Sequence, residues 1–277
     1  MMRCINFDGQ FERYATEWMR QNAAQFHNNV DAMEAKMPDV YLQWLNEPAD
    51  WLDGATPGAY FLRFDDAAAL TEMMCEYHRR GVPVPDQLLE RLTSLGAEAE
   101  EALLALLARE DAPQESVLTA VSLLGEMESS APMARYVDWI VRRAEHDDRA
   151  EMAAEALTAM GAAVVAPVLA HVEEATPSGK ETFLDILCNF PGDERILALG
   201  LALLRERPEK TALFASLLGK LGDPRAIPAL QQALDAPGIH YLDYLELRNA
   251  VEALGGDVRC ERDFSGDPYY ESLRRME

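Results

Sequence analysis

Apolar residues recur along most of the chain with the spacing of amphipathic helices. Between residues 246 and 255, Leu247, Ala250, Val251 and Leu254 fall at i, i+3, i+4 and i+7, which places them on one helical face. Alternating runs rich in Val, Ile and Thr, which would indicate β-strands, are nearly absent from the sequence. The pattern therefore predicts an all-α protein.

One sequence pattern recurs: an Ala- and Leu-rich amphipathic segment ends in an apolar residue followed by Gly, and a second apolar segment comes after it. The glycines are Gly96, Gly125, Gly161, Gly222 and Gly255, and Phe190-Pro191 takes the same place between the third and the fourth. Successive copies of this pattern are 29 to 36 residues apart in the sequence. We expect each glycine to adopt the left-handed backbone that ends the first helix of a helix pair. A single pair cannot cover its own apolar face, so the spacing predicts an α-α superhelix of about five to six stacked pairs.

The clearest unit runs from Leu221 to Leu234, where Asp223-Pro224 provides a capping side chain followed by a proline in the first helical turn. This unit resembles the short HEAT-like repeat of phycobilisome lyases and many bacterial scaffold proteins. The segment from Leu247 to Gly255 is similar to the first helix of that repeat. The resemblance covers residues 83–256 and implies a solenoid, but the family includes interaction platforms, lyases and a few DNA-repair enzymes, so it says little about function.

The first 81 residues differ from the rest, because they contain three of the four tryptophans and no repeat. We expect helices over residues 8–35, 39–46 and 66–80, joined by a turn-rich loop at 46–58. The sequence thus divides into an N-terminal helical cap region (1–81), a HEAT-like solenoid (82–256) and a C-terminal tail (257–277). The cap would cover the end of the solenoid.

Aromatic residues at the two ends of the chain allow further expectations. In an alternative interpretation of the N-terminal region, the loop around Trp51, Tyr60 and Phe61 is a docking site for a partner. In the tail, Phe264 and the Tyr269-Tyr270 pair are expected to fold back over the last repeat.

The charge of the chain narrows the classes of partner. Lys and Arg number 25 against 48 Asp and Glu, a formal net charge of −23. A protein that binds duplex nucleic acid needs cations against the phosphates, and an anionic membrane would repel this chain for the same reason. The N-terminus lacks the apolar run of a signal peptide, and the four cysteines form no CxxC motif. We expect a protein of the reducing cytoplasm that binds neither nucleic acid nor membrane.

The sequence shows no motif that commits it to catalysis or to a cofactor. The five histidines are scattered, and Cys75 with His78 is the only close Cys/His pair, which is too few ligands for a zinc site. The segment Ser178-Gly179-Lys180 resembles part of a phosphate-binding loop, but it lacks the preceding Gly and the following Ser or Thr. We expect no catalytic residues, no metal and no cofactor.

Positions in the predicted second helices suggest a binding surface. Counted from the proline of each second helix, offsets four and seven are polar in two repeats, which indicates an exposed stripe. The same offsets from Pro132 give Tyr and Trp, with Arg one turn beyond, and these residue types are enriched at binding hot spots. The predicted partner-binding residues are Tyr136, Trp139, Arg143, His171, Glu174 and Gln232. The resemblance implies that second helices line the concave groove; the alternative is that Trp139 packs onto the neighbouring repeat and leaves an ordinary solvated face.

The sequence is compatible with two functions. The first is an interaction scaffold, not an enzyme, which holds a protein or peptide partner in an acidic groove, and a basic or amphipathic partner suits that charge. The second, which only the repeat resemblance supports, is a phycobilisome-lyase-like enzyme that acts on a bilin or another cofactor-bearing protein. A DNA glycosylase built from similar repeats is disfavoured by the net charge.

Overall fold

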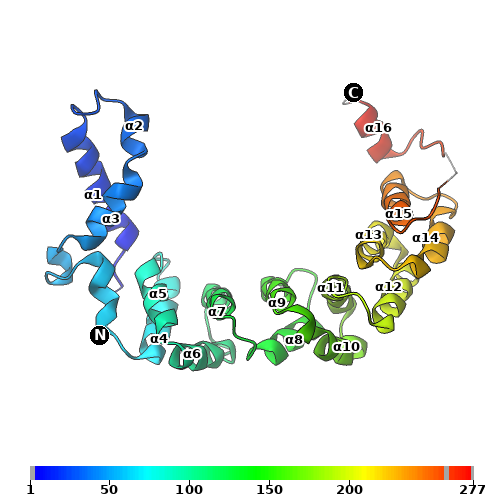
Figure 1. The fold of residues 1–277 in the computed structure, drawn as a ribbon, viewed down its shortest axis with the longest axis horizontal. Coiled ribbons are helices and arrows are strands. Elements are labelled where there is room, and N and C mark those ends of the chain that lie inside the picture. Colours follow the sequence, from blue (N-terminus) through cyan, green and yellow to red (C-terminus); the bar gives the residue numbers. More distant parts are fainter. Residues whose placement is uncertain (1–3, 259–261, 276–277) are drawn as a thin grey trace. The chain divides into compact units, whose positions relative to one another are not determined.

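The computed structural model describes residues 4–258 and 262–275. These residues form helices joined by turns and contain no strand, which confirms the predicted all-α class (Figure 1). Within the same ranges, no helix has both the length and the apolar character needed to cross a membrane. Contacts between residues divide the chain into two compact units, Met1–Pro132 and Met133–Glu277. The boundaries predicted after residues 81 and 256 mark changes of sequence character, and they stay predictions.

Unit 1 contains seven α-helices and two short 3-10 helices among its described residues. They are α1 (Phe7–Asn22), α2 (Val30–Glu34), α3 (Met37–Asn46), η1 (Asp50–Leu52), η2 (Pro57–Arg63), α4 (Ala67–Arg79), α5 (Asp86–Ser94), α6 (Ala97–Leu107) and α7 (Gln114–Glu126). The single helix predicted over residues 8–35 is wrong. His27 and Asn28 adopt positive φ angles of 52° and 59°, and Asn29 then caps α2 by accepting from Ala32 N at 3.1 Å. A helix cannot continue through left-handed backbone, so the chain turns there.

An aromatic cluster forms the core of the N-terminal part of unit 1. Phe7 is buried, and its ring lies 5.3 Å from that of Trp51 and 5.4 Å from that of Phe61. Tyr60 is also buried in this cluster, with its ring 6.0 Å from Phe7. The alternative of a docking loop is therefore wrong for Tyr60 and Phe61, because their rings fill the core, while Trp51 is half-buried.

Tyr77 of α4 fixes the N-terminal segment to this unit. Its ring is fully buried, and its hydroxyl donates to Ile5 O at 3.1 Å and accepts from Ile5 N at 3.0 Å. Burial raises the pKa of Tyr77 to about 12. Because α4 also packs on α5, α6 and α7, the predicted cap region continues into the following helices within one unit.

Unit 2 consists of helices arranged in two layers. The layers are α9 (Asp148–Ala159), α11 (Pro177–Leu187), α13 (Thr211–Leu221) and α15 (Tyr241–Ala253) on one side, and α8 (Met133–Val141), α10 (Val165–His171), α12 (Glu194–Glu206) and α14 (Ile227–Leu234) on the other (Figure 1). Short 3-10 turns precede or follow several of them: η3 (Gly161–Val164), η4 (Val172–Glu174), η5 (Pro208–Lys210) and η6 (Pro224–Ala226). Helices α13 and α15 pack closely on each other, because a Cβ added to Gly219 would lie 3.2 Å from Ala250 Cα.

The C-terminal segment packs on α15. Helix α16 (Pro268–Arg274) contacts α15, and Phe264 packs its ring 5.0 Å from Tyr241 and 4.9 Å from Tyr244. Tyr270 adds a further edge-on contact with Tyr241 at 4.9 Å. The predicted folding back of these aromatic residues is confirmed.

Most of the turn glycines behave as the repeat pattern predicts. Gly96, Gly161, Gly222 and Gly255 have φ angles between 61° and 84°, the left-handed region that ends a helix. The prediction for Gly125 is wrong, since α7 continues through it to Glu126 and the left-handed residue is Glu128, with φ 54°. The end of α7 is closed instead by hydrogen bonds from Met127 N to Leu123 O and from Ser129 N to Leu124 O, both 3.0 Å.

Candidate partner-binding site

A cavity of about 430 Å³ opens in unit 2 between the loop that follows α8, the helix α11 and the N-terminal half of α13. Its volume lies in the range of ordinary ligand sites. Its apolar part is Leu213 and Leu217 of α13, and the remainder is lined by charged and hydroxyl side chains. Leu213 is 42 % exposed, so an apolar surface faces the opening.

The first turn of α11 is fixed against the end of α8. Thr176 caps α11 by accepting from Gly179 N at 3.1 Å, while its own hydroxyl donates to Arg143 O at 2.7 Å and its N–H donates to Val141 O at 2.9 Å. Gly179 faces the carbonyl of Ile140 so closely that a Cβ there would overlap that oxygen. The Ser178-Gly179-Lys180 segment is thus a helix start in which the glycine permits close packing, and its likeness to a phosphate-binding loop is coincidental.

Ion pairs fix the charged side chains around the cavity. Glu181, with only 11 % of its side chain exposed, lies 2.7 Å from Arg207 Nη1 and 2.6 Å from Lys210 Nζ. Arg143 lies 2.7 Å from Glu151 and donates to Thr182 Oγ1 at 2.8 Å. The cations that line this cavity are therefore compensated within the protein.

The carboxylates at the rim of the cavity are more open than its cations. Asp185 is 61 % exposed and has one ion pair, with Lys220 at 2.9 Å. Glu145, in the loop after α8, is exposed beside the opening. The rim is therefore acidic around an apolar floor, an arrangement suited to a cationic group carried on an aliphatic stem.

The structure does not bring the six predicted binding residues together. Arg143 alone among them lines the cavity, and Trp139 is half-buried on α8. The expected exposure of Tyr136 is wrong, because it is 1 % exposed and packs 5.7 Å from the Trp139 ring. His171, Glu174 and Gln232 are exposed as predicted, on α10, η4 and α14.

The error at Tyr136 has a geometric cause. Helix α8 begins at Met133, directly after Pro132, whereas Pro167 and Pro228 lie inside α10 and α14 after a preceding 3-10 turn. A shift of two or three residues rotates a side chain around the helix axis, because successive residues are about 100° apart. The position four residues after Pro132 therefore lies on the core face of α8, whereas the same offset from Pro167 and from Pro228 lies on an exposed face.

Residues that the sequence reasoning missed lie on first helices and on the loop after α8. Leu213 occupies an outward position of α13, and Glu145 and Asp185 flank it across the cavity. An exposed leucine in an otherwise polar stripe is the only signal that could have pointed to this site, and it is weak because single exposed leucines are common.

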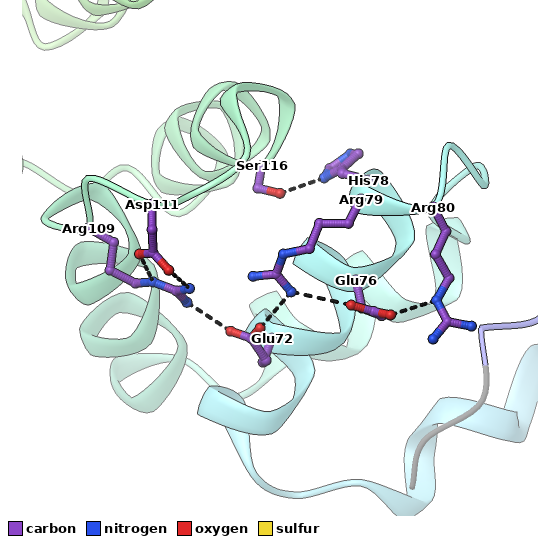
Figure 2. A network of polar contacts seen from close by, with 8 residues as sticks. All are labelled: Glu72, Glu76, His78, Arg79, Arg80, Arg109, Asp111 and Ser116. Atoms are coloured by element: carbon purple, nitrogen blue, oxygen red, sulfur yellow. Dashed lines mark hydrogen bonds and ion pairs between the residues drawn. The ribbon is translucent and has the colours of Figure 1, made fainter.

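A network of charged side chains in unit 1 links α4 to the turn between α6 and α7 (Figure 2). Glu72 accepts from Arg79 and from Arg109, each at 2.8 Å, and Arg109 also reaches Asp111 at 3.1 Å. The hydrogen bonds from Arg109 and Arg79 lower the pKa of Glu72. Further along α4, Glu76 joins Arg79 to Arg80. Opposite charges alternate throughout, which is typical of a structural clamp.

Next to this network, His78 contacts Ser116 of α7 through Nδ1 and Oγ at 2.8 Å (Figure 2). Cys75 is fully buried one turn earlier on α4, and burial raises the pKa of its thiol. Ser116 is also fully buried, and burial lowers the pKa of His78. In the described ranges, no group of three or more His, Cys, Asp and Glu is placed to hold a metal ion. This contact therefore packs α4 on α7.

Comparison of the chain with protein-family models, with curated proteins and with solved structures gives no match.

Proposed function

We propose that this chain is a HEAT-like helical-repeat protein that binds a protein or peptide partner with exposed basic side chains. The observation that carries the proposal is the cavity of unit 2, with its apolar floor at Leu213 and its acidic rim at Glu145 and Asp185. The net charge of −23 favours a basic partner at long range, because electrostatic attraction speeds encounter.

The repeat part of the proposal is supported by the two layers of unit 2 and by the left-handed glycines at its turns. Stacked helix pairs leave an extended face open, and such faces are used for binding in solenoid proteins. Cys4, Cys75 and Cys188 are free thiols, which suits the reducing cytoplasm that we propose as its setting.

The cavity suits a lysine or arginine side chain of the partner. Its aliphatic stem would cover Leu213, and its head would reach the carboxylates of Glu145 and Asp185. Covering the exposed part of one leucine contributes about 1 kcal/mol, and each exposed ion pair adds about 0.2–1 kcal/mol. A single side chain would therefore bind weakly, so a useful affinity requires neighbouring partner residues that contact α11 and α13.

The test is selection of a phage-displayed library of random peptides on the full chain, followed by calorimetric titration of the selected peptides. We expect selected sequences to be enriched in Lys and Arg, and Leu213→Asp and Glu145→Lys each to weaken their binding. Leu242→Asp is the matched control, because Leu242 is 44 % exposed on α15 and lies outside the cavity lining. Selected peptides without basic residues, or equal binding by Leu213→Asp and Leu242→Asp, would overturn the proposal.

A further inference from the structure

One carboxylate on the rim of the cavity beside α11 and α13 is already paired with a cation of this chain. Asp185 of α11 lines the cavity, and Lys220 of α13 places its Nζ 2.9 Å from Asp185 Oδ1. Lys220 lies outside the cavity lining, so it touches the rim at this carboxylate. A partner that brings a basic side chain to Asp185 therefore meets a lysine that holds the same group.

Lys220 lies on the face of α13 that also forms the floor of the cavity. Leu213, Leu217 and Lys220 are spaced at i, i+4 and i+7, which places them on one side of the helix. Lys220 lies in the last turn of α13, about 10 Å along the helix axis from Leu213. It thus has the features proposed for the side chain of the partner, which are an aliphatic stem and a cationic head that contacts the rim.

The ion pair of Lys220 with Asp185 is more exposed than the other ion pairs of the cavity lining on α11. Glu181, which Arg207 and Lys210 contact, has only 11 % of its side chain exposed. Lys220 and Asp185 are 43 % and 61 % exposed. Opening the pairs of Glu181 would leave a buried carboxylate without compensation, whereas Lys220 and Asp185 can both return to water. The pair of Lys220 therefore opens at a lower cost than those of Glu181.

We infer that Lys220 competes with the basic partner for Asp185 and thereby lowers the affinity of the cavity. A cation of the partner gains the full attraction of this carboxylate only when Lys220 leaves it, and the lost ion pair reduces the net gain. The inference rests on the proposed function, because it concerns the same cavity and the same kind of partner. It adds a residue that sets the affinity while lying outside the cavity lining.

Lys220→Met tests the inference, because methionine keeps much of the aliphatic stem and removes the charge. The probe is a basic peptide selected on the full chain, titrated by calorimetry. We expect Lys220→Met to bind this peptide about two- to fivefold more tightly, which corresponds to the strength of one exposed ion pair. Lys220→Arg, which keeps the charge, should bind it like the unchanged chain.

Lys36→Met is the matched control. Lys36 contacts Asp39 at 3.2 Å in unit 1, and both side chains are exposed, as at Lys220 and Asp185. Each Met substitution makes the net charge more negative by one, so tighter binding confined to Lys220→Met reports the local carboxylate rather than the charge of the whole chain. Circular dichroism of each variant checks that it is folded.

A double-mutant cycle with Asp185→Asn separates competition from repulsion between Lys220 and the partner. If Lys220 occupies Asp185, then Asp185→Asn weakens peptide binding more in the Lys220→Met chain than in the unchanged chain. Charges that act independently give the same loss in both.

The outcomes distinguish this inference from the proposed function. If Leu213→Asp weakens binding but Lys220→Met tightens it no more than Lys36→Met does, the inference is wrong and the proposed function stands. Equal losses from Asp185→Asn in the two chains would overturn the inference in the same way. If no basic peptide binds either chain, the proposed function fails and the inference fails with it.

Discussion

The replacement Gly179→Ala tests the account of how α11 is fixed to α8. The new Cβ would overlap the carbonyl oxygen of Ile140 and would lie 3.2 Å from both Ala175 Cβ and Thr176 Oγ1. The obstacle is backbone, which cannot rotate away, so one helix must shift at a cost of about 1–3 kcal/mol. Ala is favoured over Gly in a helix by about 1 kcal/mol, which offsets part of that cost. Because the added Cβ would overlap a backbone atom, the cost lies in the upper part of that range, and we expect a net destabilisation of about 1–2 kcal/mol.

The assay is urea unfolding followed by circular dichroism, with Gly125→Ala as the control. Gly125 lies inside α7 with a negative φ, and nothing lies within 4 Å of an added Cβ. The control should therefore gain about 0.5–1 kcal/mol. If Gly179→Ala unfolds at the same or a higher urea concentration than the unchanged chain, the close contact between α8 and α11 does not exist as described.

Three other predictions follow from groups with shifted pKa values. Tyr77→Phe removes both hydrogen bonds to Ile5, which should lower the free energy of unfolding by about 1–2 kcal/mol and speed amide exchange at Ile5. The stabilisation by Tyr77 is complete below pH 10 and is lost as the pH rises toward its pKa of about 12. An unchanged exchange rate at Ile5 would contradict the role of these hydrogen bonds. Because the pKa of Glu72 is lowered in the folded protein, its contribution to stability is present above pH ~4.3 and is lost as the pH falls. The melting temperature of Arg109→Gln should therefore change less with pH in that range than that of the unchanged chain. Equal pH dependence of the two melting temperatures would contradict this prediction. Burial raises the pKa of Cys188 to about 12, so iodoacetamide should label the half-buried Cys4 of the native protein before it labels Cys188. Equal labelling of the two cysteines, measured by mass spectrometry, would contradict the packing of Cys188 at the end of α11.

Local features of the fold were predictable because they depend on local sequence. The glycines at 96, 161, 222 and 255 occupy turns that need positive φ, and a missing Cβ is visible in the sequence itself. The folding back of Phe264 was predictable, because an aromatic side chain in an otherwise polar tail is stabilised by packing on the preceding helix. In contrast, the break after α1 depends on left-handed His27 and Asn28 within a segment whose periodicity still resembles a helix.

Features that depend on helix phase or on distant segments were not predictable. Tyr136 was misplaced because the start of α8 relative to Pro132 differs from the other repeats, and one sequence does not reveal that start. The candidate site needs Glu145, Asp185 and Leu213 to meet across three elements separated by tens of residues. Periodicity says which residues of a helix face inward, but it does not say which helix comes next to which.

The neighbour-to-neighbour packing of unit 2 has a consequence for how this unit folds. Its most extensive contacts join helices that are close in the sequence, such as α8 with α9, α12 with α13 and α14 with α15. Of these extensively packed pairs, α13 and α15 are the furthest apart in the sequence. Forming them closes only short loops, and chains with such low contact order fold within milliseconds or less. We expect unit 2 to refold rapidly after dilution from urea, without a slow search for distant partners. Its helix pairs can form one after another, each on the surface of the pair before it.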